Sequence, residues 1–266
     1  MIGTEDIEKL IKLSLFSAYL DGEKAVSLLI TARVESGKTE LVRKASECAR
    51  VLYITDLTAW GIQRKYLKQI SDGEIRTLII PDLITPLSKQ SSTVETFISF
   101  LNNLIEEGVS EVQTYAMSLK LPNPARCNVI ACIAKEHLFD RRHRWSKIGF
   151  LSRMVPISYE YGPSAIYDIM QSIALRGYKN EADFVDLNLP NSDVEVELPI
   201  DVAREIAGLA PHIVDAEKLY GFRLQKQLQT LCMANALVNN RYKVNTEDFN
   251  EIKRLSNFIN LKYKQI

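Results

Sequence analysis

Residues 30–42 read ITARVESGKTELV, and this stretch decides the fold. The apolar run at residues 26–32 predicts a buried strand, and residues 38–50 have the spacing of a helix. Between them, residues 32–39 match the pattern GxxxxGK[ST], except that Ala32 replaces the first glycine. In that pattern backbone N–H groups face phosphate oxygens, and glycine lets the backbone approach them closely. The stretch therefore predicts a strand, a phosphate-binding loop and a helix.

Two side chains of this loop and one acid have expected roles at the phosphates. Lys38 would bridge the β- and γ-phosphates, and the Thr39 hydroxyl would coordinate Mg²⁺. The apolar strand at residues 77–81 is followed by Asp82, which can hold the same ion through its water shell. Leu83 stands where many ATPases with this loop pattern have a glutamate that activates water, so we expect slow hydrolysis. The alternatives are a solvated lysine at a helix start and a capping role for Asp82.

Short apolar strands alternate with helices in the first part of the chain. We expect further strands at residues 51–55, 128–134 and 155–159, helices at residues 5–19, 61–71 and 93–107, and a hairpin or irregular insertion at residues 110–126. Thr4 is the expected cap of the first helix. This alternation predicts an α/β fold with a parallel sheet that helices cover on both faces.

After about residue 162 the strand pattern stops and only helices are expected. They lie near residues 163–176, 199–209, 217–239 and 246–262, and an acidic, loop-like segment at 178–198 interrupts them. We therefore predict two domains: a nucleotide-binding α/β domain at residues 1–162 and a smaller all-helical lid at residues 163–266.

Composition excludes several classes of protein. The 266 residues include 33 Lys and Arg and 33 Asp and Glu, so the chain is not a globally basic nucleic-acid binder. The four cysteines form no CxxC pair and there are only three histidines, so neither a zinc site nor a disulfide framework is expected. We expect the cysteines to be small core residues in a reducing compartment. No apolar run approaches a membrane span, so we expect a cytoplasmic protein without a membrane partner.

Taken together, these features resemble the AAA+ ATPases, and the resemblance covers nearly the whole chain. It rests on GKT at 37–39, the strand before Asp82, NVIACIA at 128–134, GFLSRMVPI at 149–157 and the helical C-terminal region. Residues 221–255 are similar to the lids of the MoxR-like and minichromosome-maintenance branches. The resemblance implies a five-stranded parallel sheet in the order 5-1-4-3-2, a helical lid, and a nucleotide between them.

The same resemblance implies the ligands and the site. ATP and Mg²⁺ would be held by the loop and the helix start, which are Arg33, Val34, Glu35, Ser36, Gly37, Lys38, Thr39 and Glu40. Arg153 matches the arginine finger that reaches the γ-phosphate of a neighbouring subunit, and it would act in hydrolysis with Lys38 and Asp82. Arg223 could face the nucleotide as the second sensor. For Arg153 the alternative is a helix-end arginine that pairs with a local acid. The first sensor falls near Lys135 or Glu136 without a clean match.

Two kinds of partner follow from these residues. An arginine finger needs a neighbouring copy, so the resemblance implies a homo-oligomer, usually a ring of six. The basic run RRHRWSKIGFLSR at residues 141–153 includes Trp145 and Phe150. It could engage DNA phosphates and stack on bases, form a subunit interface, or be a solvated loop.

Three functions stay open on the sequence. The first is a Mg²⁺-dependent AAA+ ATPase that remodels or loads a nucleic-acid or nucleoprotein partner. The second is a nucleotide-dependent assembly module with little or no hydrolysis. Arg153 favours the first and Leu83 favours the second. A small-molecule kinase is a weaker third interpretation. By analogy, the compact two-part architecture would suit a protein of a phage or mobile element.

Overall fold

The computed structural model describes residues 3–115, 117–176, 187–214 and 219–261. Its central sheet has five parallel strands in the order β2-β3-β6-β1-β7. Their bounds are β1 (Ser27–Ala32), β2 (Val51–Tyr53), β3 (Thr77–Ile80), β6 (Asn128–Ala134) and β7 (Met154–Ser158). Counting only these strands along the chain, the order is 5-1-4-3-2 when read from β7. The predicted fold class and strand order are therefore confirmed.

Parallel strands give the sheet two distinct edges. We call the edge where the strands end the carboxyl edge, and the edge where they begin the amino edge. At the carboxyl edge Ala32 of β1 lies opposite Ala134 of β6, and at the amino edge Ser27 lies opposite Met154 of β7. The loops that follow the strands therefore meet at the carboxyl edge, which is where open α/β sheets bind their ligands.

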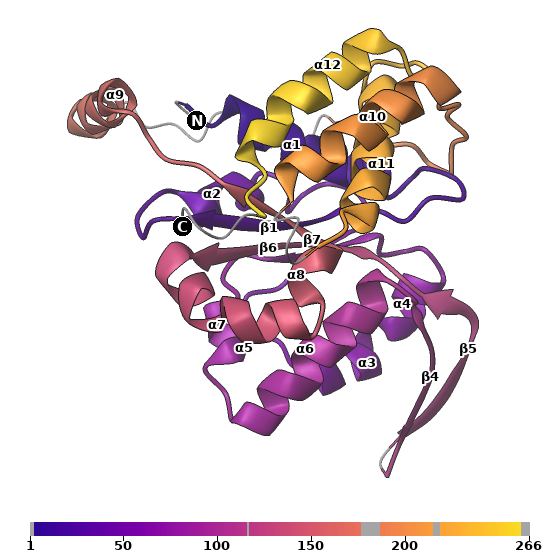
Figure 1. Cartoon of the computed structure of the whole chain (residues 1–266). Helices are drawn as coiled ribbons and strands as arrows, with labels where there is room; N and C mark the ends of the chain where they lie inside the picture. Colours follow the sequence, from indigo (N-terminus) through magenta and orange to yellow (C-terminus); the bar gives the residue numbers. More distant parts are fainter. Residues whose placement is uncertain (1–2, 116, 177–186, 215–218, 262–266) are drawn as a thin grey trace.

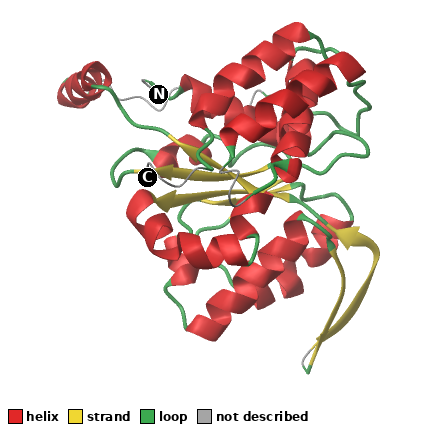
Figure 2. Ribbon diagram, viewed as in Figure 1, coloured by secondary structure: helices red, strands yellow, loops and turns green. Residues whose placement is uncertain are grey.

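Helices lie on both faces of the sheet (Figure 2). Alternate residues of the sheet enter two separate cores, one on each face. In β1, Leu28 and Ile30 pack into the first core, whereas Leu29 packs into the second. The first core also contains residues of α1 (Glu5–Ser17) and α2 (Lys38–Arg43). On the second face lie α3 (Ala59–Lys65), α4 (Leu67–Ser71), α5 (Ile84–Leu87), α6 (Ser91–Ile105), α7 (Lys135–Lys147) and α8 (Phe150–Arg153). The sheet is thus covered by helices on both faces, as predicted.

The C-terminal helices pack against α1 on the first face (Figure 1). They are α10 (Ile200–Ile213), α11 (Phe222–Val238) and α12 (Thr246–Leu255), followed by a 3-10 turn at Ser256–Phe258. The apolar stripe of α11, Leu224, Leu228 and Leu231, is buried. The Asn245 side chain accepts a hydrogen bond from the Asp248 amide and completes a capping box at α12. The division into two domains at residue 162 stays a prediction, since these helices share one core with α1.

Two elements project from this body. One is α9 (Pro163–Ala174), which Figure 1 shows apart from the helical layers at the end of an extended segment. None of the residues of α9 is buried. The other is the hairpin of β4 (Val109–Thr114) and β5 (Met117–Ala125), which confirms the expected insertion before β6. Among the described helices, none has the length and apolar character that a membrane span needs.

Several helices differ from their predicted bounds. The helix expected at residues 38–50 ends at Arg43 and continues as turns in which an N–H bonds the carbonyl three residues before it. The helix expected at residues 61–71 is interrupted at Tyr66, where φ is −122°. Thr4 occupies the expected cap position of α1, but its hydroxyl bonds the Glu8 carboxylate and not a backbone N–H. Much of the segment predicted as a loop at residues 178–198 lies outside the described residues.

Candidate functional site

The loop after β1 has an unusual backbone. Gly37 adopts the left-handed conformation, with φ 77°, directly before α2, and Glu35 also has a positive φ of 63°. Glycine takes this conformation without a steric penalty, whereas glutamate takes it uncommonly. Ala32, where the pattern has its first glycine, ends β1 and packs its methyl group into the first core. The loop therefore turns sharply at the carboxyl edge.

The Lys38 ammonium lies inside this loop. Its Nζ donates to the Ala32 carbonyl at 3.1 Å, to the Arg33 carbonyl at 2.6 Å and to Ser36 Oγ at 3.2 Å. Three acceptors from one short segment hold the charge where the chain bends around it. The ammonium is therefore held within the loop by the backbone and the Ser36 hydroxyl of that same loop.

Two carboxylates lie around Lys38 on neighbouring strands. Asp82 follows β3, and Glu136 lies in the first turn of α7, directly after β6. Burial lowers the pKa of Lys38, and the charges of these carboxylates oppose that shift. The nearby Cys132 thiol is neutral at physiological pH because burial raises its pKa to about 12. The structure thus brings Lys38 and Asp82 together and places Glu136 near them, a residue that the sequence indicated only as a position near the first sensor.

Asp82 and Leu83 differ sharply in their surroundings. Asp82 is exposed, and its Oδ1 accepts a hydrogen bond from the Ile84 amide at 3.0 Å, which is the capping contact expected as its alternative role. Leu83 is fully buried in the second core, and its N–H donates to the Cys132 carbonyl at 2.8 Å. The position after Asp82 therefore supports the sheet and offers no group that could activate water.

Two tyrosines that the sequence analysis missed hold the loop from the side of β7. The hydroxyls of Tyr159 and Tyr161 both donate to the Ser36 carbonyl, each at 2.9 Å. The two rings also meet edge to face, 5.7 Å between centroids. Burial raises the pKa of Tyr159, so its hydroxyl stays protonated and remains a donor. The sequence offered one indication of their role: both tyrosines come at or just after the end of the expected strand that lies beside β1. Because parallel strands end at the same edge, side chains at that position lie near the loop that follows β1.

The other predicted loop residues face outward. Arg33, Val34, Glu35 and Thr39 are exposed, whereas Gly37 and Glu40 are half-buried. Arg33 lies 3.7 Å from Glu160, whose carboxylate also pairs with Lys135 at 2.5 Å. The Lys135 hydrogen bond lowers the pKa of Glu160. These charges join the loop to the ends of β6 and β7.

Arg153 and Arg223 lie at the amino edge, away from the loop of their own chain. Arg153 Nη1 donates to the Gly149 carbonyl at 2.9 Å, and its Nε lies 3.6 Å from Glu106 Oε2. Arg223 Nε lies 3.4 Å from the same Glu106 oxygen, and its Nη1 donates to Ser152 Oγ at 3.0 Å. The local pairing considered as the alternative role of Arg153 is therefore present, and Glu106 joins the two arginines.

The charges of this cluster depend on one another. Burial favours a higher pKa for Glu106, but the Lys24 hydrogen bond and the two arginines outweigh it and lower the pKa. Burial lowers the pKa of Arg153, and the neighbouring charge of Arg223 acts in the same direction. Glu106 therefore belongs to the cluster at the amino edge, away from the Lys38 loop of its own chain.

The sheet separates this cluster from the Lys38 loop. Arg153 directly precedes β7, whose first residue pairs with Ser27, and the loop begins after Ala32. Five to six residues at about 3.3 Å each give a separation on the order of 17–20 Å along the strands. Within one chain, therefore, Arg153 and Arg223 do not share a site with Lys38.

The basic run at residues 141–153 forms helices and not a loop. Its aromatic residues Trp145 and Phe150 are buried in the second core, so the expectation that they stack on bases is wrong. Arg144 pairs with Glu95, and the Arg142 guanidinium lies 3.8 Å from the ring centroid of the exposed Phe139. The apolar spacing within α7 buries one side of the helix, and the basic residues occupy the other.

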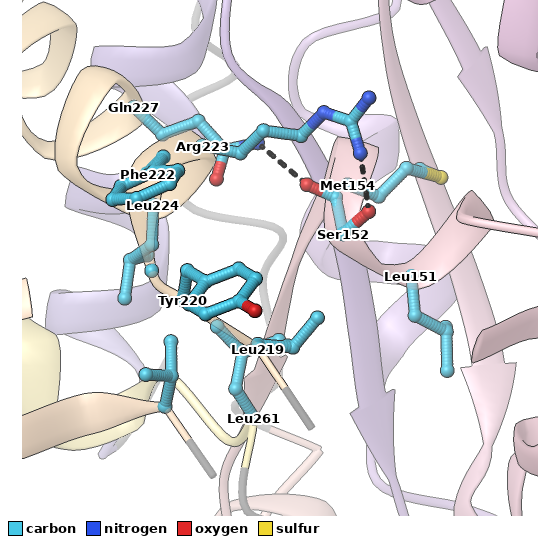
Figure 3. A pocket seen from close by; sticks show the side chains of 12 residues that line it. Leu151, Ser152, Met154, Leu219, Tyr220, Phe222, Arg223, Leu224, Gln227 and Leu261 are labelled. Atoms are coloured by element: carbon cyan, nitrogen blue, oxygen red, sulfur yellow. Dashed lines mark hydrogen bonds between the residues drawn. The ribbon is translucent and has the colours of Figure 1, made fainter. Parts of the chain in front are cut away.

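Beside Arg223 the surface is hollowed (Figure 3). The hollow has a volume of about 270 Å³ and lies between the start of β7 and the start of α11. Its lining is mostly apolar: Leu151, Met154, Val214, Leu219, Tyr220, Phe222, Leu224 and Leu261, with Ser152, Gly221, Arg223 and Gln227. The exposed rings of Tyr220 and Phe222 stack with centroids 5.5 Å apart.

The fold has a counterpart among solved structures. The chain matches the crystal structure of a full-length MCM homolog from Methanopyrus kandleri with a TM-score of 0.55 and 15% sequence identity. The chain has an AAA+-like fold. The match covers 97% of this chain and 56% of that chain, so this chain spans little more than half the length of that protein. No protein-family model matches the sequence, and no curated protein matches it either.

Proposed function

We propose that this chain is an AAA+-type ATP-binding protein whose triphosphate lies on residues 33–39. The observation that carries the proposal is the Lys38 ammonium enclosed by its own loop at the carboxyl edge, with Asp82 after the strand β3. Lys38 would meet the β- and γ-phosphates, and backbone N–H groups from Val34 to Thr39 would meet the remaining phosphate oxygens.

The side chains at this edge fit a magnesium ion. The Thr39 hydroxyl and the Asp82 carboxylate are exposed oxygen donors, and Mg²⁺ prefers oxygen ligands that leave room for several waters. Asp82 Oδ1 already accepts from Ile84, which orients the carboxylate at the end of β3. When bound, Mg²⁺ neutralises part of the phosphate charge.

We further propose that Arg153 and Arg223 serve the nucleotide of a neighbouring copy. They lie at the opposite edge from Lys38, so a head-to-tail interface would bring the two sets together, and repetition of such an interface closes a ring. Arg223 is better placed to reach out, because its side chain is 45% exposed and that of Arg153 is 20% exposed. Both arginines would first have to leave Glu106.

Slow hydrolysis, or assembly without hydrolysis, is the form of this function that the site favours. The position after Asp82 is the buried Leu83. Glu136, in the first turn of α7 directly after β6, is a second exposed carboxylate whose charge acts on Lys38 besides Asp82, so it is our candidate base. If Glu136→Gln hydrolyses ATP as the wild type does, this assignment is wrong.

A nucleic-acid or nucleoprotein partner is a separate proposal that rests on α7. The helix exposes His143, Arg144 and Lys147 on one side, where Arg144 pairs with Glu95. Lysine and arginine on one face attract phosphates and make binding depend on salt. Fluorescence anisotropy with labelled single-stranded DNA should show binding that weakens as salt rises and in Arg144→Ala.

Calorimetry with Mg-ATP tests the nucleotide proposal. Lys38→Ala removes the ammonium group from the loop and should weaken binding at least about tenfold, which corresponds to about 1.4 kcal/mol. Lys253→Ala, at an exposed position of α12, is the matched control and should bind as the wild type does. Equal affinities in the two variants would refute the proposal.

Mixing of subunits tests the shared site. Arg153→Ala and Lys38→Ala should each be inactive alone, and a mixture should recover activity because some interfaces pair an intact loop with an intact arginine. Arg64→Ala, an exposed arginine of α3, is the control and should retain activity. A mixture that stays inactive while the wild type is active would show that Arg153 acts only within its own chain.

A further inference from the structure

We propose that α9 of one copy docks its apolar face into the hollow beside Arg223 of the next copy. This inference rests on the shared site of the proposed function, because it uses the same head-to-tail interface. It adds a second contact to that interface. This second contact forms without nucleotide and without an arginine.

One side of α9 is an exposed apolar surface. Ile166, Met170 and Ile173 follow the helical spacing of three and four residues, and they are 42%, 63% and 60% exposed. Tyr167 beside them is 63% exposed. A contiguous apolar surface of this kind on a folded chain marks an interaction site. The helix therefore has a face that no described residue of its own chain covers.

The hollow offers a surface of matching chemistry. Its lining includes Tyr220 and Phe222, which are 86% and 70% exposed, and most of the other side chains that line it are apolar (Figure 3). Exposed aromatic side chains around an apolar depression are typical of the centre of a protein–protein interface.

The two surfaces cannot meet within one chain. Helix α9 begins at Pro163, after the carboxyl end of β7, whereas Leu151 and Met154 of the hollow lie where β7 begins. Figure 1 shows α9 apart from the body, on the side away from α8. In a head-to-tail pair that brings Arg223 to the neighbour's Lys38 loop, the neighbour's α9 lies on the same side as that loop. The hollow and α9 then face each other.

The composition of α9 favours a second copy over a lipid surface. Its twelve residues, PSAIYDIMQSIA, contain no lysine or arginine. Helices that lie on membranes carry Lys and Arg on their polar face, which meets anionic headgroups. The polar face of α9 carries Asp168 instead, which such a surface would repel.

Cross-linking between single-cysteine variants tests the docking. Met170→Cys and Phe222→Cys place thiols on the two surfaces, and the four native cysteines are buried. With a short bis-maleimide, the mixture of the two variants should give a covalent dimer, and neither variant alone should. Asp168→Cys, on the polar side of α9, is the matched control and should cross-link to Phe222→Cys far less.

Three outcomes would overturn the docking. A dimer from Met170→Cys alone would show that two α9 helices pair with each other. A cross-link within a chain carrying both substitutions, with none in the mixture, would show contact inside one copy. The absence of any α9 cross-link at concentrations where the protein sediments as an oligomer would exclude the contact.

A charge substitution provides an independent measurement. Met170→Asp should raise the Kd of self-association about tenfold or more, measured by sedimentation, and should leave thermal unfolding unchanged because α9 has no buried residue. Failure of this inference and failure of the proposed function are distinguishable. Recovery of activity in the Arg153→Ala and Lys38→Ala mixture without an α9 cross-link leaves the shared site and removes the docking. A specific cross-link together with unchanged ATP affinity in Lys38→Ala would support the docking and refute the proposed nucleotide site.

Discussion

The paired tyrosines lead to a prediction about how the Lys38 loop is held. Tyr159 and Tyr161 donate to one oxygen, the Ser36 carbonyl, and each phenylalanine substitution removes one donor. A single substitution leaves the oxygen paired and should weaken Mg-ATP binding only about twofold, which is about 0.4 kcal/mol. The double substitution leaves the Ser36 carbonyl without either hydroxyl donor. Because Ser36 is only 8% exposed, the unpaired carbonyl should destabilise the formed loop by about 1–3 kcal/mol.

The loss of binding free energy in the double variant should therefore exceed the sum of the losses in the two single variants. Binding of ATP needs the loop in its formed conformation, so the apparent Kd rises as the fraction of formed loop falls, by about 5- to 150-fold at full coupling. Calorimetry on the wild type, both single variants and the double variant completes a mutant cycle. Tyr167→Phe, on exposed α9, is the control. Additive losses, or a double variant that binds as the wild type does, would refute the argument that the tyrosines share one acceptor.

Three further predictions follow from buried or paired groups. The isolated protein should release phosphate well below the ~1–100 s⁻¹ of efficient phosphoryl transfer, because Leu83 occupies the usual position of the base; turnover within that range would contradict this. Asp248→Asn should lower the free energy of unfolding by about 3 kcal/mol, since the fully buried carboxylate accepts two hydrogen bonds from Arg241; a urea titration showing under about 1 kcal/mol would disagree. The hydrogen bond from Arg254 holds the pKa of Glu251 at about 2, below the unfolded value of about 4.3. The ionised Glu251 carboxylate therefore stabilises the fold fully above pH ~4.3, and this stabilisation is lost as the pH falls through ~2. The Glu251→Gln variant should be less stable than the wild type at pH 7 but not at pH 2.

The local sequence pattern was sufficient to predict the strands and the loop that contains Lys38. β1 and β6 are continuous apolar runs, because a strand of a covered parallel sheet is buried on both sides, and such runs are visible in the residues themselves. GKT between strand and helix likewise marks its own position, since a phosphate loop is built from consecutive residues.

Helix bounds depended on contacts that no local pattern contains. The helix expected to reach residue 50 ends at Arg43, and the next residue, Lys44, is buried beside Glu8 of α1 with its Nζ 3.0 Å from Oε1. Trp145 and Phe150 looked like exposed aromatics within a basic run, but they are buried in the second core because α7 and α8 pack there. Burial of this kind is decided by elements distant in the chain.

By itself the sequence determined the fold class, the strand order expected from its resemblance, and the loop that holds Lys38. Only the tertiary structure decided which charged groups share a site. The sheet brings Asp82, Glu136 and the paired tyrosines to the carboxyl edge, because parallel strands from distant segments end together there. The same sheet keeps Arg153 at the amino edge with Glu106. The physical reason is that residue spacing specifies a face and a direction locally, whereas proximity between distant segments arises only when their apolar faces pack into one core.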